Sequence, residues 1–296
     1  MDNLELNPIG SSELIINQDG SIFHLHLKPG NVANNILLVG DPGRVKMISE
    51  FFTEIECEAS NREFTSVTGQ YNGMRITAVS TGIGTDNIDI VLNELDALVN
   101  IDFETRKIKS EKTHLNIIRI GTSGGLQNYL DINSFVASHK AIGFDGVLNF
   151  YANRNQISDI DFEQSFKLHT GWNPMLTSPY VVNCSEKLFR KIIDENFVSG
   201  VTISAPGFYG PQGRVIRLPL ADPDINEKIE NFNYKDHRIT NYEMECSAIY
   251  GLSALLGHEA LTVCLIIANR LSKQANDDYH GKMKQLVKLV LDRLTV

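Results

Sequence analysis

The sequence has few cysteines and no long apolar run, and each absence excludes a class of protein. Its 296 residues include four cysteines, which are far apart and form no Cys-x-x-Cys pair. We therefore expect neither a zinc site nor a disulfide framework. No stretch reaches the roughly 20 consecutive apolar residues of a membrane span, and no basic segment followed by an apolar one opens the sequence. These absences predict a cytoplasmic protein without a membrane partner.

Positive charge is scarce as well. The 27 lysines and arginines are outnumbered by 36 aspartates and glutamates, which gives a formal net charge of -9. A chain with this balance has no long-range field that would attract nucleic acid or an anionic membrane, so neither is an expected partner. Any anion that the protein binds must be held locally by a few residues.

Strand patterns and helical patterns alternate along most of the chain, which predicts an α/β fold. Buried strands are expected at residues 34–39, 74–81, 116–120, 134–142, 200–205 and 261–268. The last helix is expected to bury one face, made of Met283, Leu286, Val287, Val290, Leu291 and Leu294. Because no repeat or linker divides the chain, we predict an N-terminal extension at residues 1–20 and one domain at residues 21–296.

Three other segments have weaker patterns. Residues 21–28 alternate between apolar and polar side chains and are predicted to form a short strand or an extended arm. Residues 100–114 carry charges of both signs, which is typical of a solvated helix extension or a loop. Residues 271–280 are polar and could form a lid over a binding site.

The strand at residues 116–120 is apolar apart from one arginine, Arg119, which needs a partner. The next five residues read Gly-Thr-Ser-Gly-Gly and supply two hydroxyls and exposed backbone N–H groups, which suits an anion such as phosphate. In an open α/β sheet, ligands collect where such a loop follows a strand. A Gly-rich turn beside a structural ion pair of Arg119 explains the same stretch equally well.

Other loops that follow predicted strands also combine glycines with polar groups. Residues 40–44 read Gly-Asp-Pro-Gly-Arg, in which Asp41 is placed to cap a helix whose amino end favours anions. Residues 82–87 begin Gly-x-Gly, but Asn87 stands where a dinucleotide fingerprint has its third glycine, so we reject that interpretation.

Four motifs, taken in order, resemble the nucleoside phosphorylase family. They are Gly-Asp-Pro-Gly-Arg at 40–44, Arg-Ile-Gly-Thr-Ser-Gly at 119–124, Phe-Tyr-Gly-Pro-Gln-Gly-Arg at 208–214 and Glu-Met-Glu at 243–245. The resemblance extends from about residue 24 to residue 270, and the third motif is similar to that of the uridine phosphorylase branch. It implies a single-domain three-layer α/β/α sandwich around a central mixed, twisted sheet.

The resemblance also implies a role for individual residues. Phosphate would be bound by Gly40, Arg44, Arg119 and Thr122, together with Arg62 from a neighbouring subunit. Ribose would be bound by Glu243, Met244 and Glu245, together with His24 from that subunit, and the base by Phe208, Gln212 and Arg214. Arg119, Arg214 and Glu245 would be the catalytic residues. Without the resemblance, Glu245 would be read as a helix cap, His24 as a solvent-facing strand residue, Phe208 as a core residue and Arg214 as a surface residue.

The implied reaction is the reversible phosphorolysis of uridine to uracil and ribose 1-phosphate in nucleoside salvage. Purine-cleaving relatives carry an aspartate at the position of Asn269, which cannot protonate a base in that way. Related nucleosidases use water and do not need the paired arginines, so phosphorolysis is preferred over hydrolysis. A purine or broad-specificity phosphorylase and a non-catalytic nucleoside-binding protein are the alternatives.

The family resemblance finally implies a homo-oligomer with shared sites, either a dimer or a hexamer built as a trimer of dimers. Its substrates would be small molecules, a nucleoside and phosphate, and no cofactor or metal is expected beyond phosphate as co-substrate. Relatives can hold a monovalent cation at the dimer interface through residues matching Glu63, Ile83 and a serine. Asn87 stands at the serine position here, which argues against that cation.

Overall fold

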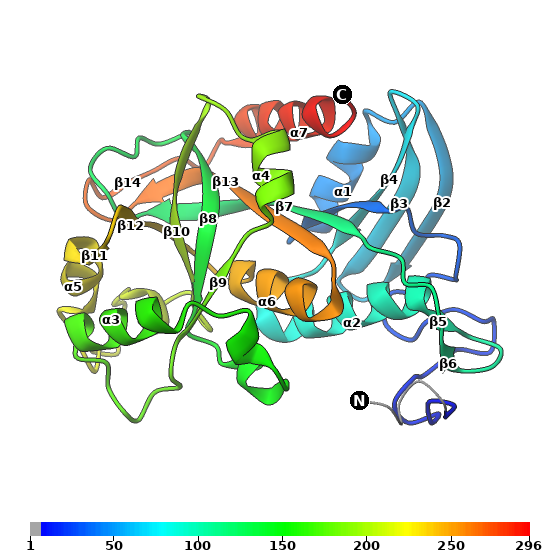
Figure 1. Ribbon diagram of the computed structural model, residues 1–296. Coiled ribbons are helices and arrows are strands. Elements are labelled where there is room, and N and C mark those ends of the chain that lie inside the picture. The colour runs from blue at the N-terminus through cyan, green and yellow to red at the C-terminus, as the bar shows by residue number, and fades with distance from the viewer. Residues whose placement is uncertain (1–6) are drawn as a thin grey trace.

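A mixed twelve-stranded sheet runs through the molecule, with helices on both of its faces (Figure 1). The computed structural model describes residues 7–296. The strands are β1 (Asn35–Val39), β2 (Glu54–Asn61), β3 (Phe64–Tyr71), β4 (Met74–Ser80), β7 (Asn116–Gly125), β8 (Phe135–Gly143), β9 (Tyr180–Asn183), β10 (Phe197–Ser204), β11 (Asn233–Tyr234), β12 (His237–Glu243), β13 (Glu259–Asn269) and β14 (Gln274–Ala275). β5 (Ile101–Asp102) and β6 (Lys107–Ile108) form a separate pair.

The helices are α1 (Pro42–Ser49), α2 (Thr85–Asn100), α3 (Ile160–Thr170), α4 (Glu186–Ile192), α5 (Ile225–Asn231), α6 (Cys246–Leu256) and α7 (His280–Leu294). Short 3-10 turns lie at Val147–Phe150, Arg154–Gln156 and Gly210–Gln212. With α1, α4 and α7 over one face of the sheet and α2 and α6 over the other, the predicted α/β/α sandwich is confirmed (Figure 1). No helix within residues 7–296 is both long and apolar enough to cross a membrane.

The sheet closes on itself at one end. Its strand order is β11-β12-β10-β8-β13-β7-β1-β4-β3-β2, with β9 added to β8 and β14 to β13. β12 also pairs with the end of β7, where Asn241 lies opposite Gly125 and Tyr242 opposite Gly124. This extra pairing joins β7, β13, β8, β10 and β12 into a ring, and it brings the carboxyl ends of β7 and β12 side by side.

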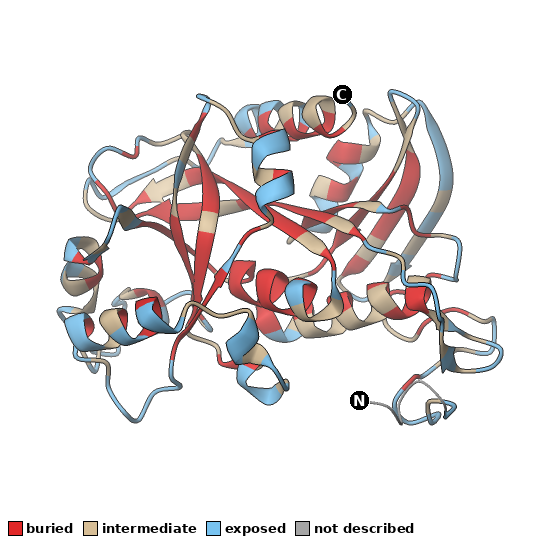
Figure 2. Ribbon diagram, in the orientation of Figure 1, coloured by how far each residue is buried: buried red, intermediate tan, exposed pale blue. Residues whose placement is uncertain are grey.

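The core is concentrated around this ring. Figure 2 shows β7, β8, β13 and α6 mostly buried, whereas β2 at the far edge of the sheet is largely exposed. The first eight residues of α6, from Cys246 to Ser253, are all buried, as expected of a helix that is apolar on every side. The six apolar residues predicted to line one face of α7 are buried as well.

Three local predictions need correction or refinement. Residues 121–125 are the second half of β7 rather than a loop, because β13 and β12 supply ladder partners on either side. Residues 21–28 contain a turn at 23–25 and a single bridge from Ile22 to Ile16, with His26 at a φ of 52°, so no strand is present there. α2 ends at Asn100, and the rest of the segment to residue 114 is a loop with the β5–β6 pair, which is the second of the two predicted alternatives.

The described part of the N-terminal extension contacts the turn between β5 and β6. The N–H of Ile9 donates to the carbonyl of Arg106, and the Arg106 side chain donates to the carbonyls of Ile9 and Gly10 at 2.7 and 3.0 Å. Leu14 is buried in the main core. Residues 1–6 of the extension lie outside the described residues.

Candidate active site

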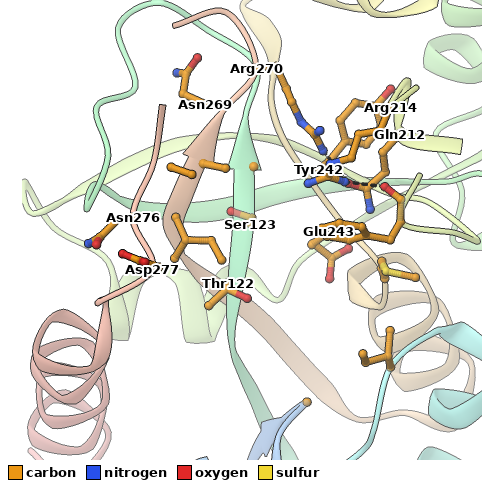
Figure 3. A pocket seen from close by; sticks show the side chains of 18 of the residues that line it. Thr122, Ser123, Gln212, Arg214, Tyr242, Glu243, Asn269, Arg270, Asn276 and Asp277 are labelled. Carbon is orange, nitrogen blue, oxygen red and sulfur yellow. Dashed lines mark hydrogen bonds between the residues drawn. The ribbon is translucent and has the colours of Figure 1, made fainter. Parts of the chain in front are cut away.

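A cavity of about 690 Å³ opens beside the ends of β7, β12 and β13 (Figure 3). Ten of the predicted site residues line it, although they come from four separate parts of the sequence. They are Gly40, Arg44, Arg119, Thr122, Phe208, Gln212, Arg214, Glu243, Met244 and Glu245. The structure therefore brings together the four motifs that the sequence singled out.

Arg119 lies buried at one end of this cavity between two carboxylates. Its Nη1 is 3.1 Å from Oε2 of Glu243, and its Nη2 pairs with Oε2 of Glu245. Burial by itself would lower the pKa of Arg119, but Glu245 and then Glu243 hold it above its ordinary value. The third nitrogen, Nε, has no hydrogen-bond partner among the described residues. A buried unpaired donor is unfavourable by about 1–3 kcal/mol, so the two carboxylates must offset this cost.

The glycine at position 121 makes room for this guanidinium. A Cβ added there would lie 2.1 Å from Nη1 of Arg119, closer than any side chain can approach. The glycine is needed for this close approach and not for a left-handed φ, since it lies within β7. The sequence pattern suggested a loop with exposed N–H groups for an anion. In the structure, Gly121 instead allows Arg119 to pack closely against the backbone of β7.

The two carboxylates are held by different parts of the backbone. Glu243 accepts hydrogen bonds from Oγ of Ser204 at 2.5 Å and from the N–H groups of Glu245 and Cys246 at 2.9 and 3.0 Å. Burial raises the pKa of Glu243 to about 6, despite the opposing effect of Arg119. Glu245 accepts from the N–H of Gly84 at 2.7 Å and makes no cap to α6. Glu243, not Glu245, therefore bonds the first turn of that helix.

A second arginine lines the same end of the cavity. Arg44 follows Asp41, which caps α1 by accepting from the N–H of Gly43 at 2.8 Å, as predicted. Its Nη1 donates to the carbonyl of Ile120 at 3.2 Å. Burial, and next the positive charge of Arg119, lower the pKa of Arg44. Two neighbouring guanidiniums form a local site for an anion. Such a local site is needed because the net charge of the chain is negative and would not attract an anion from a distance.

The opposite end of the cavity holds Gln212 between two arginines. Its Oε1 accepts from Nη1 of Arg214 at 2.6 Å and from Nη2 of Arg270 at 2.8 Å, and Figure 3 shows the three side chains converging. Because both neighbours can only donate, the amide oxygen must face them, and the amide nitrogen is the donor left for a ligand.

Arg214 lies over the ring of Phe208, with Cζ 3.5 Å from the ring centroid. Burial and the nearby charge of Arg270 lower the pKa of Arg214 to about 10. Phe208 itself is 50% exposed, so it is neither the core residue of the alternative interpretation nor fully covered by Arg214.

Sequence reasoning missed Arg270. It lies directly after Asn269, the last residue of β13. The available signal was the same as for Arg119, an arginine at the carboxyl end of a buried strand. Asn269 has a separate role, because its Nδ2 donates to the carbonyls of Gln127 and Leu130 at 3.0 and 2.8 Å. Figure 3 shows it turned away from Arg270.

His24 and Arg62 do not line this cavity. Arg62 is exposed in the turn between β2 and β3, and Nδ2 of the adjacent Asn61 donates to the carbonyl of His24 at 2.9 Å. The two predicted residues therefore share one surface region, outside the cavity of their own chain. Among the described residues, no group of three or more His, Cys, Asp or Glu side chains is arranged to hold a metal ion.

The family model of the phosphorylase superfamily matches residues 35–294. The chain belongs to the phosphorylase superfamily. It is thus an enzyme of the pentosyltransferase type, and the family resemblance drawn from the four motifs is confirmed.

Among its relatives in this superfamily, a uridine phosphorylase of Thermococcus kodakarensis is 28% identical over 270 residues, covering 89% of this chain and 83% of the relative. A DeoD-type purine nucleoside phosphorylase of Listeria monocytogenes is 27% identical over 244 residues, covering 82% of this chain and 85% of the relative. The crystal structure of a Trypanosoma brucei nucleoside phosphorylase, described as showing uridine phosphorylase activity, has a TM-score of 0.87. It is 30% identical and covers 95% of this chain and 99% of that chain.

Proposed function

We propose that this phosphorylase acts on uridine and converts it reversibly to uracil and ribose 1-phosphate in nucleoside salvage. The observation that carries the proposal is the group formed by Gln212, Arg214 and Arg270 at one end of the cavity. The polar groups that this cluster has left for a ligand are donors, which suit the carbonyl oxygens of a pyrimidine and the negative charge that the base acquires on leaving.

Phosphate would bind at the other end, against Arg44, Arg119, Thr122 and the backbone of Gly40. The presence of both Arg44 and Arg119 in the cavity lining supports this assignment, since a charge-assisted hydrogen bond contributes roughly 1.5–3 kcal/mol. Arg62 of the partner subunit would complete the site in a homo-oligomer, a dimer or a hexamer.

The ribose would lie between these ends on Met244, and Glu245 would accept hydrogen bonds from its 2′- and 3′-hydroxyls. Glu245 is paired with Arg119. A phosphate that takes over part of Arg119 would free Glu245 for the sugar, with Glu243 keeping the arginine in place.

In the reaction, a phosphate oxygen would form the new bond to C1′ as the bond from C1′ to N1 of uracil breaks. The electron pair of that bond moves onto uracil, where Gln212 and Arg214 stabilise the resulting anion while Phe208 stacks on the ring. Positioning and electrostatics would supply the catalysis, without a covalent enzyme intermediate. Asn269 would take no part, because its amide is committed to backbone groups.

The test is a panel of uridine, thymidine, inosine and adenosine, each incubated with and without phosphate while free base is measured. Phosphate-dependent release of uracil faster than of hypoxanthine or adenine supports the proposal. Faster release of a purine would instead favour the activity named for the Listeria relative, and release without phosphate would indicate hydrolysis. No release from any nucleoside would indicate a binding protein.

A further inference from the structure

The carboxylate of Glu94, on α2, holds the segment that carries His24. Its oxygens accept hydrogen bonds from the N–H of His24 at 3.0 and 3.1 Å and from the N–H of Leu25 at 2.8 Å. Oε1 of Glu94 also lies 2.6 Å from Nδ1 of His24. The two side chains are only 13% and 25% exposed, so solvent competes weakly for these contacts.

This contact decides which nitrogen of His24 carries the proton. A carboxylate can only accept, so Nδ1 must be the donor, and in the neutral ring Nε2 is then an acceptor. The orientation of the ring is restricted as well. Phe23 and Phe64 meet it edge to face, with ring centroids 4.7 and 6.2 Å away, and Nδ2 of Asn61 donates to the His24 carbonyl.

α2 connects this histidine to the cavity. The N–H of Gly84, just before α2, donates to Glu245 in the cavity, whereas Glu94 lies ten residues further along the chain. At 1.5 Å per residue, the helix separates the two points by about 15 Å. His24 is therefore held at a distance from the cavity of its own chain, beside the turn that carries Arg62.

We infer that Glu94 is a positioning residue, which holds His24 so that its Nε2 accepts a hydrogen bond from the nucleoside 5′-hydroxyl in the cavity of a partner subunit. The inference rests on the proposed function and on the ribose contact across subunits that the family resemblance implies for His24. If Glu94 served only to anchor the turn at residues 22–27, its loss would affect all substrates alike. If it acts through His24, its loss must affect only substrates that have a 5′-hydroxyl.

The experiment compares kcat/KM for uridine and for 5′-deoxyuridine, which lacks that hydroxyl. The wild type should prefer uridine by about tenfold, the effect of one hydrogen bond. His24→Ala should remove most of this preference. Glu94→Gln should also remove most of it, because the amide presents a donor to Nδ1 and so reverses the tautomer. The double variant should resemble His24→Ala, and activity on 5′-deoxyuridine should stay within about twofold throughout.

Asp96→Asn is the matched control. Asp96 also lies on α2 and contacts a histidine, Nε2 of His258, at 3.2 Å, but it is unconnected to His24. The uridine preference should survive this change. Nitrogen-15 NMR of the imidazole provides a readout that does not need activity, with protonated Nδ1 expected in the wild type and protonated Nε2 in Glu94→Gln.

Three results would count against these ideas at different levels. Equal losses on both substrates in Glu94→Gln, or an unchanged tautomer, would overturn the positioning role of Glu94. A preference that survives His24→Ala would remove His24 from the site, and Glu94 with it. Absence of phosphate-dependent cleavage of either substrate by the wild type would overturn the proposed function itself.

Discussion

Both ends of the cavity contain arginines, but in the part of the chain that the structure describes only one end has an arginine paired with carboxylates. Arg119 is buried between Glu243 and Glu245, which neutralise it. Within residues 7–296, neither Arg214 nor Arg270 pairs with a carboxylate, and the two share only the neutral oxygen of Gln212. With Arg44 counted, one end has two guanidiniums and two carboxylates and is electrically balanced, whereas the other keeps an excess of positive charge.

This difference predicts how much each end contributes to the stability of the fold and to catalytic activity. The balanced end is part of the folded core, so its geometry should be rigid and its loss should affect stability as well as activity. The unbalanced end carries destabilised charges that a negative group would relieve, so its loss should affect turnover and hardly affect stability. Four predictions test this contrast, beginning with the largest expected effect.

Arg119→Ala should lower both stability and activity. It leaves Glu243 and Glu245 buried without their partner, and breaking a buried pair in this way costs about 3–5 kcal/mol. Chemical unfolding and phosphorolysis rates would measure the two effects. Arg154→Ala is the control, because it breaks an ion pair with buried Glu163 outside the cavity and should reduce stability without changing kcat. An Arg119→Ala variant as stable as the wild type would contradict the contrast.

Arg214→Ala should reduce kcat by about 10²–10³-fold, the usual effect of losing one group that stabilises developing charge. The KM for phosphate should change little, since phosphate is proposed to bind at the opposite end. The midpoint of unfolding should also stay nearly constant. Arg217→Ala, three residues further along and exposed, should match the wild type. An unchanged kcat would remove Arg214 from the mechanism.

Asn269→Asp should destabilise the protein by more than about 2 kcal/mol, because a carboxylate would then face the carbonyls of Gln127 and Leu130 that now accept hydrogen bonds. It should not produce cleavage of inosine, although the family resemblance implies an aspartate at this position in purine-cleaving relatives. Asn231→Asp, which is exposed, is the stability control. New inosine phosphorolysis would show that the residue at this position can reach the base.

Substitution of Glu243 should have the smallest effect, which is a change in how the free energy of unfolding depends on pH. Its folded pKa of about 6 lies above the ordinary value of 4.5, so its contribution to stability is complete below about pH 4.5 and is lost as the pH rises through 6. Glu243→Gln should flatten this decline in unfolding experiments across the window. Glu186→Gln, on the surface, should leave it unchanged. Parallel declines in wild type and Glu243→Gln would contradict the assignment.

Much of the fold could be read from local patterns, and the reason is physical. The stripe on α7, the Asp41 cap and the apolar strands each depend on neighbours in the sequence. The prediction for residues 121–125 was wrong because β12 and β13, distant in the sequence, supply the ladder that turns a glycine-rich stretch into strand. Arg270 was missed because only the fold places it beside Gln212.

The sequence by itself determined the α/β class, the family and the residue types available for binding an anion and a base, because these follow from periodicity and from motifs contiguous in the chain. Only the tertiary structure decided which charges neutralise one another. Ion pairs such as Arg119 with Glu245 join residues more than a hundred positions apart, and Coulomb interactions depend on distance in space, which the linear order of residues does not specify.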